Sequence, residues 1–422
     1  MRGAGDTDGA IVAFRRSVAL NPNCAVVKDL AWALAPRGGL EEARAAWETF
    51  LRRDPPDHDS WDGYAQLSLF LGNEGAYRRA RKALLERFGN TTNDWIVAER
   101  TSLACLLLPG SADELRGAIR LADHAVAAGE KPTEPGNPYL RFVKGLAVYR
   151  QGRPQEALRW LQESAEKLPN RAGPRLALAM AQFQSGSPIQ ARKTLAAAVR
   201  AYNWNEPAAA SRADYPTIWV CHVLRREAEA MILPNLPAFL KGEYQPQDND
   251  ERLALLGICR SRGLSGAAAR LFADAFETDP GLVDDLTTDC LRRTQGPEHP
   301  GDPIEVFNAA CRYLAARCAA LAGCGLGKNG DKLSEAERTH WRKRAREWLR
   351  ADLAMWATAL HSDTPSARHL AKRMLTNWRT DPDLAGLREP DRLMMLPADE
   401  RKGFLALWAE VGAVLARCGN TP

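Results

Sequence analysis

Residues 138–170 read PYLRFVKGLAVYRQGRPQEALRWLQESAEKLPN, and this stretch decides the fold. Its second half places apolar residues three or four positions apart, at Ala157, Leu158, Leu161, Ala165 and Leu168. Gly152 breaks the helical pattern in the middle, and Pro154 suits the first turn of a new helix, where its missing N–H costs little. The stretch therefore predicts two antiparallel helices, 139–150 and 155–168, joined by a tight turn.

Small residues recur along the chain at a nearly constant spacing. Gly152 and Gly186 are 34 residues apart, and Gly38 and Gly72 are also 34 residues apart. Pro22 and Pro55 are separated by 33 residues. A period of this length, with a helix pair in each period, indicates an array of helical repeats.

The order of small and large residues within one period resembles the tetratricopeptide repeat. In 138–170 the matching positions are Gly145, Gly152, Ala157, Leu161 and Pro169. Comparable units cover 24–56, 172–204 and 249–281; 58–90 fits less well, with Tyr77 where a small residue is usual, and 96–129 is divergent. The resemblance implies an all-α fold, a right-handed α-solenoid of antiparallel helix pairs. Each pair has to stack on its neighbours because it cannot bury its apolar face alone.

The breaks between periodic segments predict the organisation of the chain. Pro- and Gly-rich stretches interrupt the array at 129–138, 205–216, 237–250 and 294–303. The expected parts are 1–129 with N-terminal repeats, 138–204 with two well-formed units, 205–248 as an irregular helical insert, 249–281 as a further unit, 304–360 as a long helical hairpin and 361–422 as a C-terminal helical cap. Residues 5–10 read as an inter-helix turn without a preceding first helix. That start in mid-repeat predicts a truncated gene model or the detached tail of a longer protein.

Several phrases of the C-terminal half carry a second resemblance. They are FNAAC at 307–311, WLRADL at 348–353, WRTDPDLAG at 378–386 and LWAEV at 407–411. These phrases, and residues 61–89, are similar to the helical tails of large bacterial serine/threonine protein kinases, in which repeats of this kind follow a kinase domain. The resemblance implies a bacterial kinase signalling system as the setting and a kinase domain as a candidate partner. The alternative is that the chain is the C-terminal part of such a kinase, with its catalytic domain upstream.

The chain itself offers no visible catalytic machinery. It contains no glycine-rich phosphate loop of the kinase type, no HRD catalytic loop and no DFG, so we expect no enzymatic activity and no catalytic residues. The turn at 323–329 lacks the first glycine and the Ser/Thr of a phosphate loop. Histidines and cysteines lack metal-ligand spacing, so no metal and no cofactor are expected.

Composition limits the compartment and the partner. The 422 residues carry a net charge of +5, too small a bias to indicate nucleic acid, so no nucleic-acid partner is expected. The alternative, a basic patch along 338–350, has acidic residues that partly offset it. Apolar runs fall far short of the roughly 20 residues of a membrane span, and 1–16 lack the apolar core of a secretion signal. Nine scattered cysteines without a disulfide pattern favour a reducing cytoplasm.

In the repeats that this chain resembles, the first helix of each pair lines a concave surface. The matching positions here are Tyr139, Phe142, Leu146 and Tyr149 in one unit and Leu176, Met180 and Phe183 in the next. Their spacing puts each set on one helical face. This set, called the groove set below, predicts an apolar surface for a protein or peptide ligand. The alternative, given equal weight, is that a neighbouring segment around 205–240 packs on it.

Overall fold

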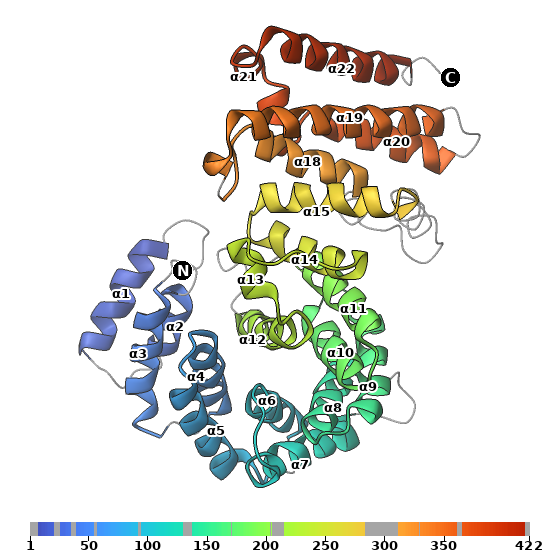
Figure 1. Cartoon of the computed structure of the whole chain (residues 1–422). Helices are drawn as coiled ribbons and strands as arrows, with labels where there is room; N and C mark the ends of the chain where they lie inside the picture. The colour runs from blue at the N-terminus through green and yellow to red at the C-terminus, as the bar shows by residue number, and fades with distance from the viewer. Residues whose placement is uncertain are drawn as a thin grey trace. The chain divides into compact units, whose positions relative to one another are not determined.

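The computed structural model describes residues 7–20, 26–34, 39–54, 57–91, 94–129, 137–169, 171–202, 204, 215–282, 311–328, 330–360 and 365–417. The chain divides into two compact units, Met1–Tyr244 and Gln245–Pro422. Throughout the described ranges the regular structure is helical (Figure 1). The predicted all-α fold is confirmed.

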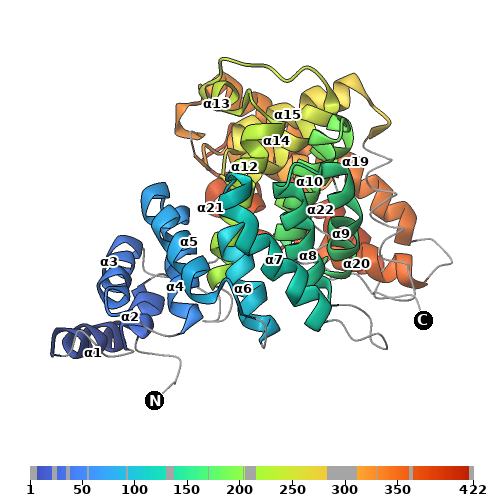
Figure 2. The same cartoon turned by 90° about the horizontal axis from the view of Figure 1, so that it is seen from below.

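The first unit holds α1 (Thr7–Leu20), α2 (Val26–Leu34), α3 (Leu40–Leu51), α4 (His58–Phe70), α5 (Glu74–Phe88), α6 (Trp95–Cys105), α7 (Ala112–Gly129), α8 (Pro138–Arg150), α9 (Pro154–Lys167), α10 (Ala172–Gln184), α11 (Pro188–Ala201), α12 (Tyr215–Ile232) and α13 (Leu236–Lys241). Helices α2 to α11 form five antiparallel pairs that follow one another along the chain (Figures 1 and 2). Each pair matches one repeat unit of the sequence, except that α6 begins at Trp95, one residue before the unit 96–129. The stacked pairs make the predicted α-solenoid.

Two positions in the α8–α9 pair show why the repeat needs small residues. A Cβ added to Gly145 would lie 2.6 Å from Leu161 Cγ, so α8 and α9 approach closely only because that side chain is absent. Gly152 has φ of +73°, a left-handed conformation that glycine adopts without steric cost, and this conformation makes the turn between the two helices. Pro154 lies in the first turn of α9, as its sequence position predicts.

The insert expected at 205–248 contains a long helix. Residues 205–214 lie outside the described residues, and α12 follows them with 18 residues. It packs against α4, α10 and α11, and Figure 1 shows it on the inner side of the curve made by the helix pairs of this unit. Residues 215–241 are therefore a helical part of the first unit.

The second unit holds α14 (Asn249–Ser261), α15 (Ser265–Thr278), α18 (Cys311–Gly323), the short 3-10 helix η2 (Gly330–Lys332), α19 (Glu335–Leu360), α20 (Pro365–Trp378), the 3-10 helix η3 (Pro382–Leu387), α21 (Pro390–Leu393) and α22 (Ala398–Arg417). Helices α14 and α15 form the pair predicted at 249–281. Helices α18 and α19 form the long hairpin, of which 304–310 lie outside the described residues.

A capping box starts the second helix of the hairpin, and an aromatic contact joins the first helix to the C-terminal helices. Ser334 and Glu337 form a capping box at the start of α19: Ser334 N–H donates to Glu337 Oε2 at 2.9 Å, and Glu337 N–H donates to Ser334 Oγ at 3.3 Å. Tyr313 of α18 stacks on Trp378 of α20, with ring centroids 5.3 Å apart. The buried aromatic rings tie the hairpin to the C-terminal helices.

Among the described residues, no helix combines the length and the apolar character that crossing a bilayer requires.

Candidate protein-binding groove

The structure brings the groove set together on two neighbouring helices. Tyr139, Phe142, Leu146 and Tyr149 lie on α8, and Leu176, Met180 and Phe183 lie on α10. Five of these seven side chains are buried, and only Tyr139 and Phe183 are partly exposed. The first helices do carry an apolar surface, but that surface is largely covered within this unit.

Helix α12 covers part of this surface. It packs on α10, and Tyr149 O–H of α8 lies 3.8 Å from Met231 Sδ of α12. Burial raises the pKa of Tyr149 to about 12, so its hydroxyl stays protonated at neutral pH. Met231, which lies within 205–240, thus contacts one residue of the groove set, and this is the kind of contact that the alternative predicts. Binding of an outside peptide to these residues stays a prediction.

Arginine side chains hold α12 at the carboxyl ends of three first helices. Arg150 of α8 donates from Nε to Leu106 O at 2.8 Å and from Nη2 to Leu107 O at 3.0 Å, just past α6. Its Nη2 also donates to Glu227 Oε2 of α12 at 2.6 Å. Arg226 of α12 donates to Leu69 O of α4 at 3.0 Å. Carbonyls at helix carboxyl ends lack intrahelical partners and carry partial negative charge, so these guanidinium contacts are favourable.

An aromatic cluster anchors the amino-terminal half of α12. Trp219 meets Trp47 of α3 edge to face, with centroids 6.4 Å apart. His222 lies between Phe70, at 5.3 Å, and Trp204, at 5.2 Å. Burial, together with the nearby charges of Arg225 and Arg226, lowers the pKa of His222 to about 4. His222 is therefore neutral at pH 7 and packs as an aromatic ring.

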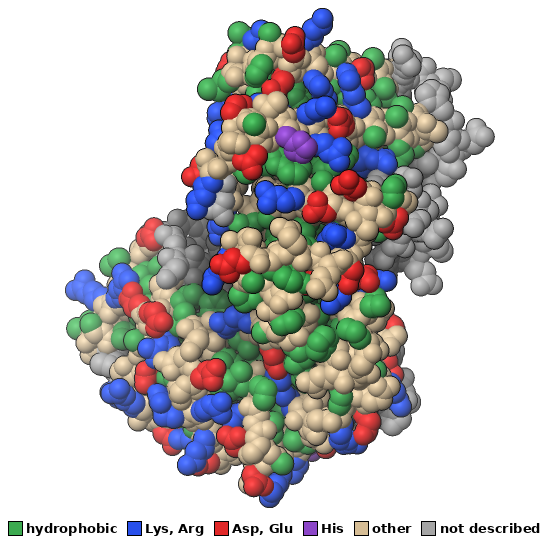
Figure 3. Space-filling model, in the orientation of Figure 1, with side chains coloured by type: hydrophobic (Ala, Val, Ile, Leu, Met, Phe, Trp, Pro, Cys, Tyr) green, Lys and Arg blue, Asp and Glu red, His purple; other side chains and the backbone are tan. Residues whose placement is uncertain are grey.

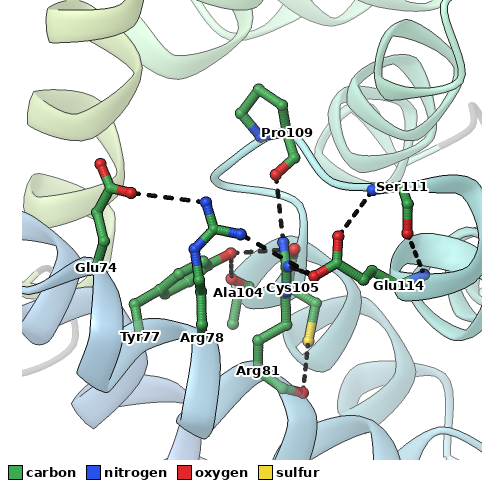
Figure 4. A network of polar contacts seen from close by, with 9 residues as sticks. All are labelled: Glu74, Tyr77, Arg78, Arg81, Ala104, Cys105, Pro109, Ser111 and Glu114. Carbon is green, nitrogen blue, oxygen red and sulfur yellow. Dashed lines mark hydrogen bonds and ion pairs between the residues drawn. The ribbon is translucent and has the colours of Figure 1, made fainter.

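A separate polar network joins the pair α4–α5 to the pair α6–α7 (Figure 4). Tyr77 O–H of α5 lies 2.9 Å from Ala104 O and 3.0 Å from Cys105 O, where α6 ends. Arg81 is buried and donates to Glu114 Oε1 of α7 at 2.8 Å. Tyr77 thus stands in a small-residue position because its hydroxyl caps the next repeat. The network is a structural junction and leaves no open site.

A pair of buried carboxyls, which the repeat pattern did not reveal, lies in the same register as the groove set. Asp62 is the fifth residue of α4 and Glu99 the fifth of α6, just as Phe142 is of α8 and Leu176 of α10. Burial, with the negative charges of Asp59 and Glu99 near it, raises the pKa of Asp62 to about 8. Burial also raises the pKa of Glu99 to about 7. The fifth residue of the first helix is apolar in α8 and α10 but acidic in α4 and α6. This difference in the sequence could have revealed Asp62 and Glu99.

Asp62 and Glu99 differ in how well their oxygens are paired. Gln66 Nε2 donates to Asp62 Oδ1 at 2.7 Å, one turn along α4. Gln66 Oε1 and Glu99 Oε1 are buried and accept no hydrogen bond. Buried acceptors of this kind cost stability and are uncommon in folded proteins.

The described residues show no metal-binding group, and their cysteines are poorly suited to act as nucleophiles. They contain no group of three or more His, Cys, Asp or Glu side chains placed to hold a metal ion. Burial raises the pKa of the thiols of Cys105, Cys221, Cys259, Cys318 and Cys324, which disfavours the nucleophilic thiolate.

The turn after α18 and the basic run on α19 also have structural roles. In the turn, the N–H groups of Gly325, Leu326 and Lys328 donate to carbonyls at 3.0, 2.8 and 2.8 Å, so they are not directed at an anion. In the basic run, Arg342 is buried and paired with Glu335 and Glu400, each at 2.6 Å. On the face in Figure 3, basic and acidic side chains are interspersed over the described residues.

Comparison with known proteins supports the repeat assignment over part of the chain. Residues 148–214 match the family model described as tetratricopeptide repeat. No curated protein matches the chain. Among solved structures, the human IFIT1 dimer with m7Gppp-AAAA is 12% identical over 97% of this chain and 96% of that chain, with a TM-score of 0.24. A TM-score that low supports no inference about fold or ligand. The family match spans the end of α8 and the helices α9, α10 and α11, so the tetratricopeptide-repeat assignment holds for this part of the first unit.

Proposed function

We propose that the chain is a non-catalytic scaffold that binds a helical segment of a partner protein on the inner surface of its first unit. The observation that carries this proposal is α12, which lies against α4 and α10 and contacts α8 through Tyr149 and Arg150. An amphipathic helix laid on an apolar surface is a common mode of peptide recognition. The inner surface holds α12 by aromatic contacts and by carbonyls at helix ends. The same groups are suited to bind a helix of a partner protein.

The proposed setting is a bacterial serine/threonine kinase system, with a kinase catalytic domain as a partner and the cytoplasm as the site of action. This part of the proposal rests on the resemblance of the C-terminal phrases to kinase tails. In the second unit the resembling residues Trp348, Trp378 and Leu407 are buried, so they support packing of the helices. The phrase at 307–311 lies outside the described residues.

A peptide added in trans tests the scaffold proposal. The probe is a fluorescein-labelled peptide of residues 215–232, titrated into the full chain and into its Trp219→Ala variant, in which α12 loses its contact with Trp47. We expect saturable binding to the variant, seen as a rise in fluorescence anisotropy, and at least tenfold weaker binding to the natural chain. Trp160→Ala, on the outer helix α9, is the matched control and should behave as the natural chain does. Equal binding to all three proteins, or none to Trp219→Ala, contradicts the proposal.

The kinase setting needs its own test. The full chain is mixed with the purified catalytic domain of a serine/threonine kinase encoded beside it, and complex formation is followed by analytical ultracentrifugation. A stable complex supports the setting, and separate sedimentation of the two proteins contradicts it. An in-frame HRD and DFG sequence in the DNA directly upstream would favour the alternative, in which both parts belong to one kinase.

A further inference from the structure

The carboxyls of Asp62 and Glu99 are placed where the inner surface would otherwise be apolar. They are the fifth residues of the first helices α4 and α6, and the corresponding residues of α8 and α10 are Phe142 and Leu176. Since the fold tolerates large apolar side chains at this register, packing of the helix pairs does not require a carboxyl there. The acidic residues need another explanation.

Two acceptors of this cluster have no donor among the described residues. Gln66 donates its amide to Asp62, but its own Oε1 accepts nothing. Glu99 Oε1 also accepts nothing, although the Glu99 side chain is more than nine-tenths buried. Two buried oxygens from neighbouring helices therefore receive no hydrogen bond from the described protein groups, which is costly unless a further donor reaches them.

The approach to the cluster combines charge with an apolar contact. Asp59 lies one turn before Asp62 on α4 and is exposed, as is Ile96, one turn before Glu99 on α6. Arg100 Nη1 lies 2.6 Å from Asp59 Oδ1 and neutralises that carboxylate. The charged groups that act on Asp62 are Asp59 and His58 from its own helix and Glu99 and Arg100 from α6. When all three carboxyls are ionised and His58 is neutral, the cluster carries two negative charges in excess. A cation bound there would favour the ionised carboxyls over the protonated forms that their raised pKa values favour.

We propose that Asp62, Gln66 and Glu99 form a subsite for one basic side chain, Lys or Arg, of the partner protein. Lys and Arg carry several N–H donors and no acceptor, which suits the two buried oxygens that accept no hydrogen bond. The exposed Ile96 offers an apolar contact for the aliphatic part of that side chain. The inference rests on the proposed function, because it names a chemical feature of the protein segment that the inner surface of the first unit would bind.

The test uses the full chain and three fluorescein-labelled peptides, hexalysine, hexaarginine and hexaglutamate, in fluorescence anisotropy titrations. We expect one-site binding of hexalysine or hexaarginine, whichever side chain fits, and none of hexaglutamate. The net charge of +5 opposes unspecific binding of the cationic peptides. Glu99→Gln and Asp62→Asn, which keep the side-chain shapes, should each weaken binding at least tenfold.

Glu86→Gln is the matched control. Glu86 is exposed on the outer helix α5, and its substitution removes the same single negative charge. It should bind as the natural chain does. Circular dichroism and thermal unfolding verify that Glu99→Gln and Asp62→Asn fold, and we expect their midpoints to match or exceed that of the natural chain. Absence of saturable binding by both basic peptides, or an equal loss in Glu86→Gln, overturns the subsite. If the peptide of residues 215–232 still binds Trp219→Ala in that case, the subsite alone is wrong and the scaffold proposal stands.

Discussion

Arg150 and Glu227 form a two-pronged ion pair between α8 and α12, and the Arg150 side chain is only 2% exposed. The same guanidinium also binds two carbonyls at the end of α6. One side chain therefore joins three helices of the first unit, and Glu227 is its charged partner from α12.

Removal of Glu227 leaves a buried charge without its counter-ion. We expect Glu227→Ala to lower the free energy of unfolding by about 3 kcal/mol, because a buried guanidinium retains only its carbonyl partners. Urea unfolding followed by circular dichroism measures this change. Glu86→Ala breaks an exposed pair with Lys82 and should cost less than about 1 kcal/mol. Equal effects of the two substitutions would show that Arg150 does not depend on Glu227.

The close approach of α8 and α9 predicts that position 145 tolerates no side chain larger than that of glycine. A methyl group there would lie 2.6 Å from Leu161 Cγ and 3.2 Å from Leu161 N, so we expect Gly145→Ala to destabilise the chain by about 1–3 kcal/mol. Gly75→Ala in α5 is the control, since the nearest atom to the added methyl is 3.7 Å away. That substitution should leave stability unchanged or raise it by up to about 1 kcal/mol. Thermal unfolding of both variants measures these changes. An unfolding midpoint of Gly145→Ala equal to that of the natural chain would refute the packing argument.

The raised pKa of Asp62 makes one contribution to stability depend on pH. The folded chain holds the Asp62 proton up to about pH 8, whereas the unfolded chain releases it near pH 4. Between these values the folded state binds more protons, so this contribution to stability falls as pH rises from about 4 to about 8. We therefore expect Asp62→Asn to gain stability relative to the natural chain over that window. Urea unfolding at a series of pH values tests this, and a constant difference contradicts it.

His222 predicts the opposite pH dependence on the acid side. Its pKa is lowered from 6.5 to about 4, so the unfolded chain binds the extra proton between these values. The contribution of neutral His222 is complete above about pH 6.5 and is lost as pH falls through about 4. We expect His222→Gln to show a smaller loss of stability than the natural chain between pH 6.5 and 4. The same unfolding series at acid pH measures it, and parallel curves would rule out this role for His222.

The helix pairs could be predicted because their determinants are local. All of these determinants lie within one repeat, so their spacing in the sequence revealed them. They are Gly145 opposite Leu161, the left-handed Gly152, and Pro154 at the start of α9. Tyr77 could be seen only as an exception, because its hydrogen-bond acceptors are carbonyls at the end of the following repeat's first helix.

The packing of α12 on the first helices depends on contacts that are distant in sequence. Tyr149 meets Met231, and Arg226 meets Leu69 O, across more than 80 and more than 150 residues. No periodicity encodes such pairings, so the sequence left an open and a covered groove as equal alternatives. Asp62 and Glu99 were missed because charged residues on amphipathic helices are normally solvated, and only a comparison of helix registers shows their inward position.

The placement of α12 makes the proposed partner binding a competition between the partner and a segment of the same chain. A segment tethered to its own binding surface has an effective concentration on the order of millimolar. For an intrinsic α12 dissociation constant on the order of 1 µM, the surface would be vacant about one part in a thousand, and the apparent affinity of a partner would fall about a thousandfold. A partner with the same contacts as α12 would then be excluded at ordinary cellular concentrations. Only a protein that makes more contacts than α12 makes would then bind this inner surface.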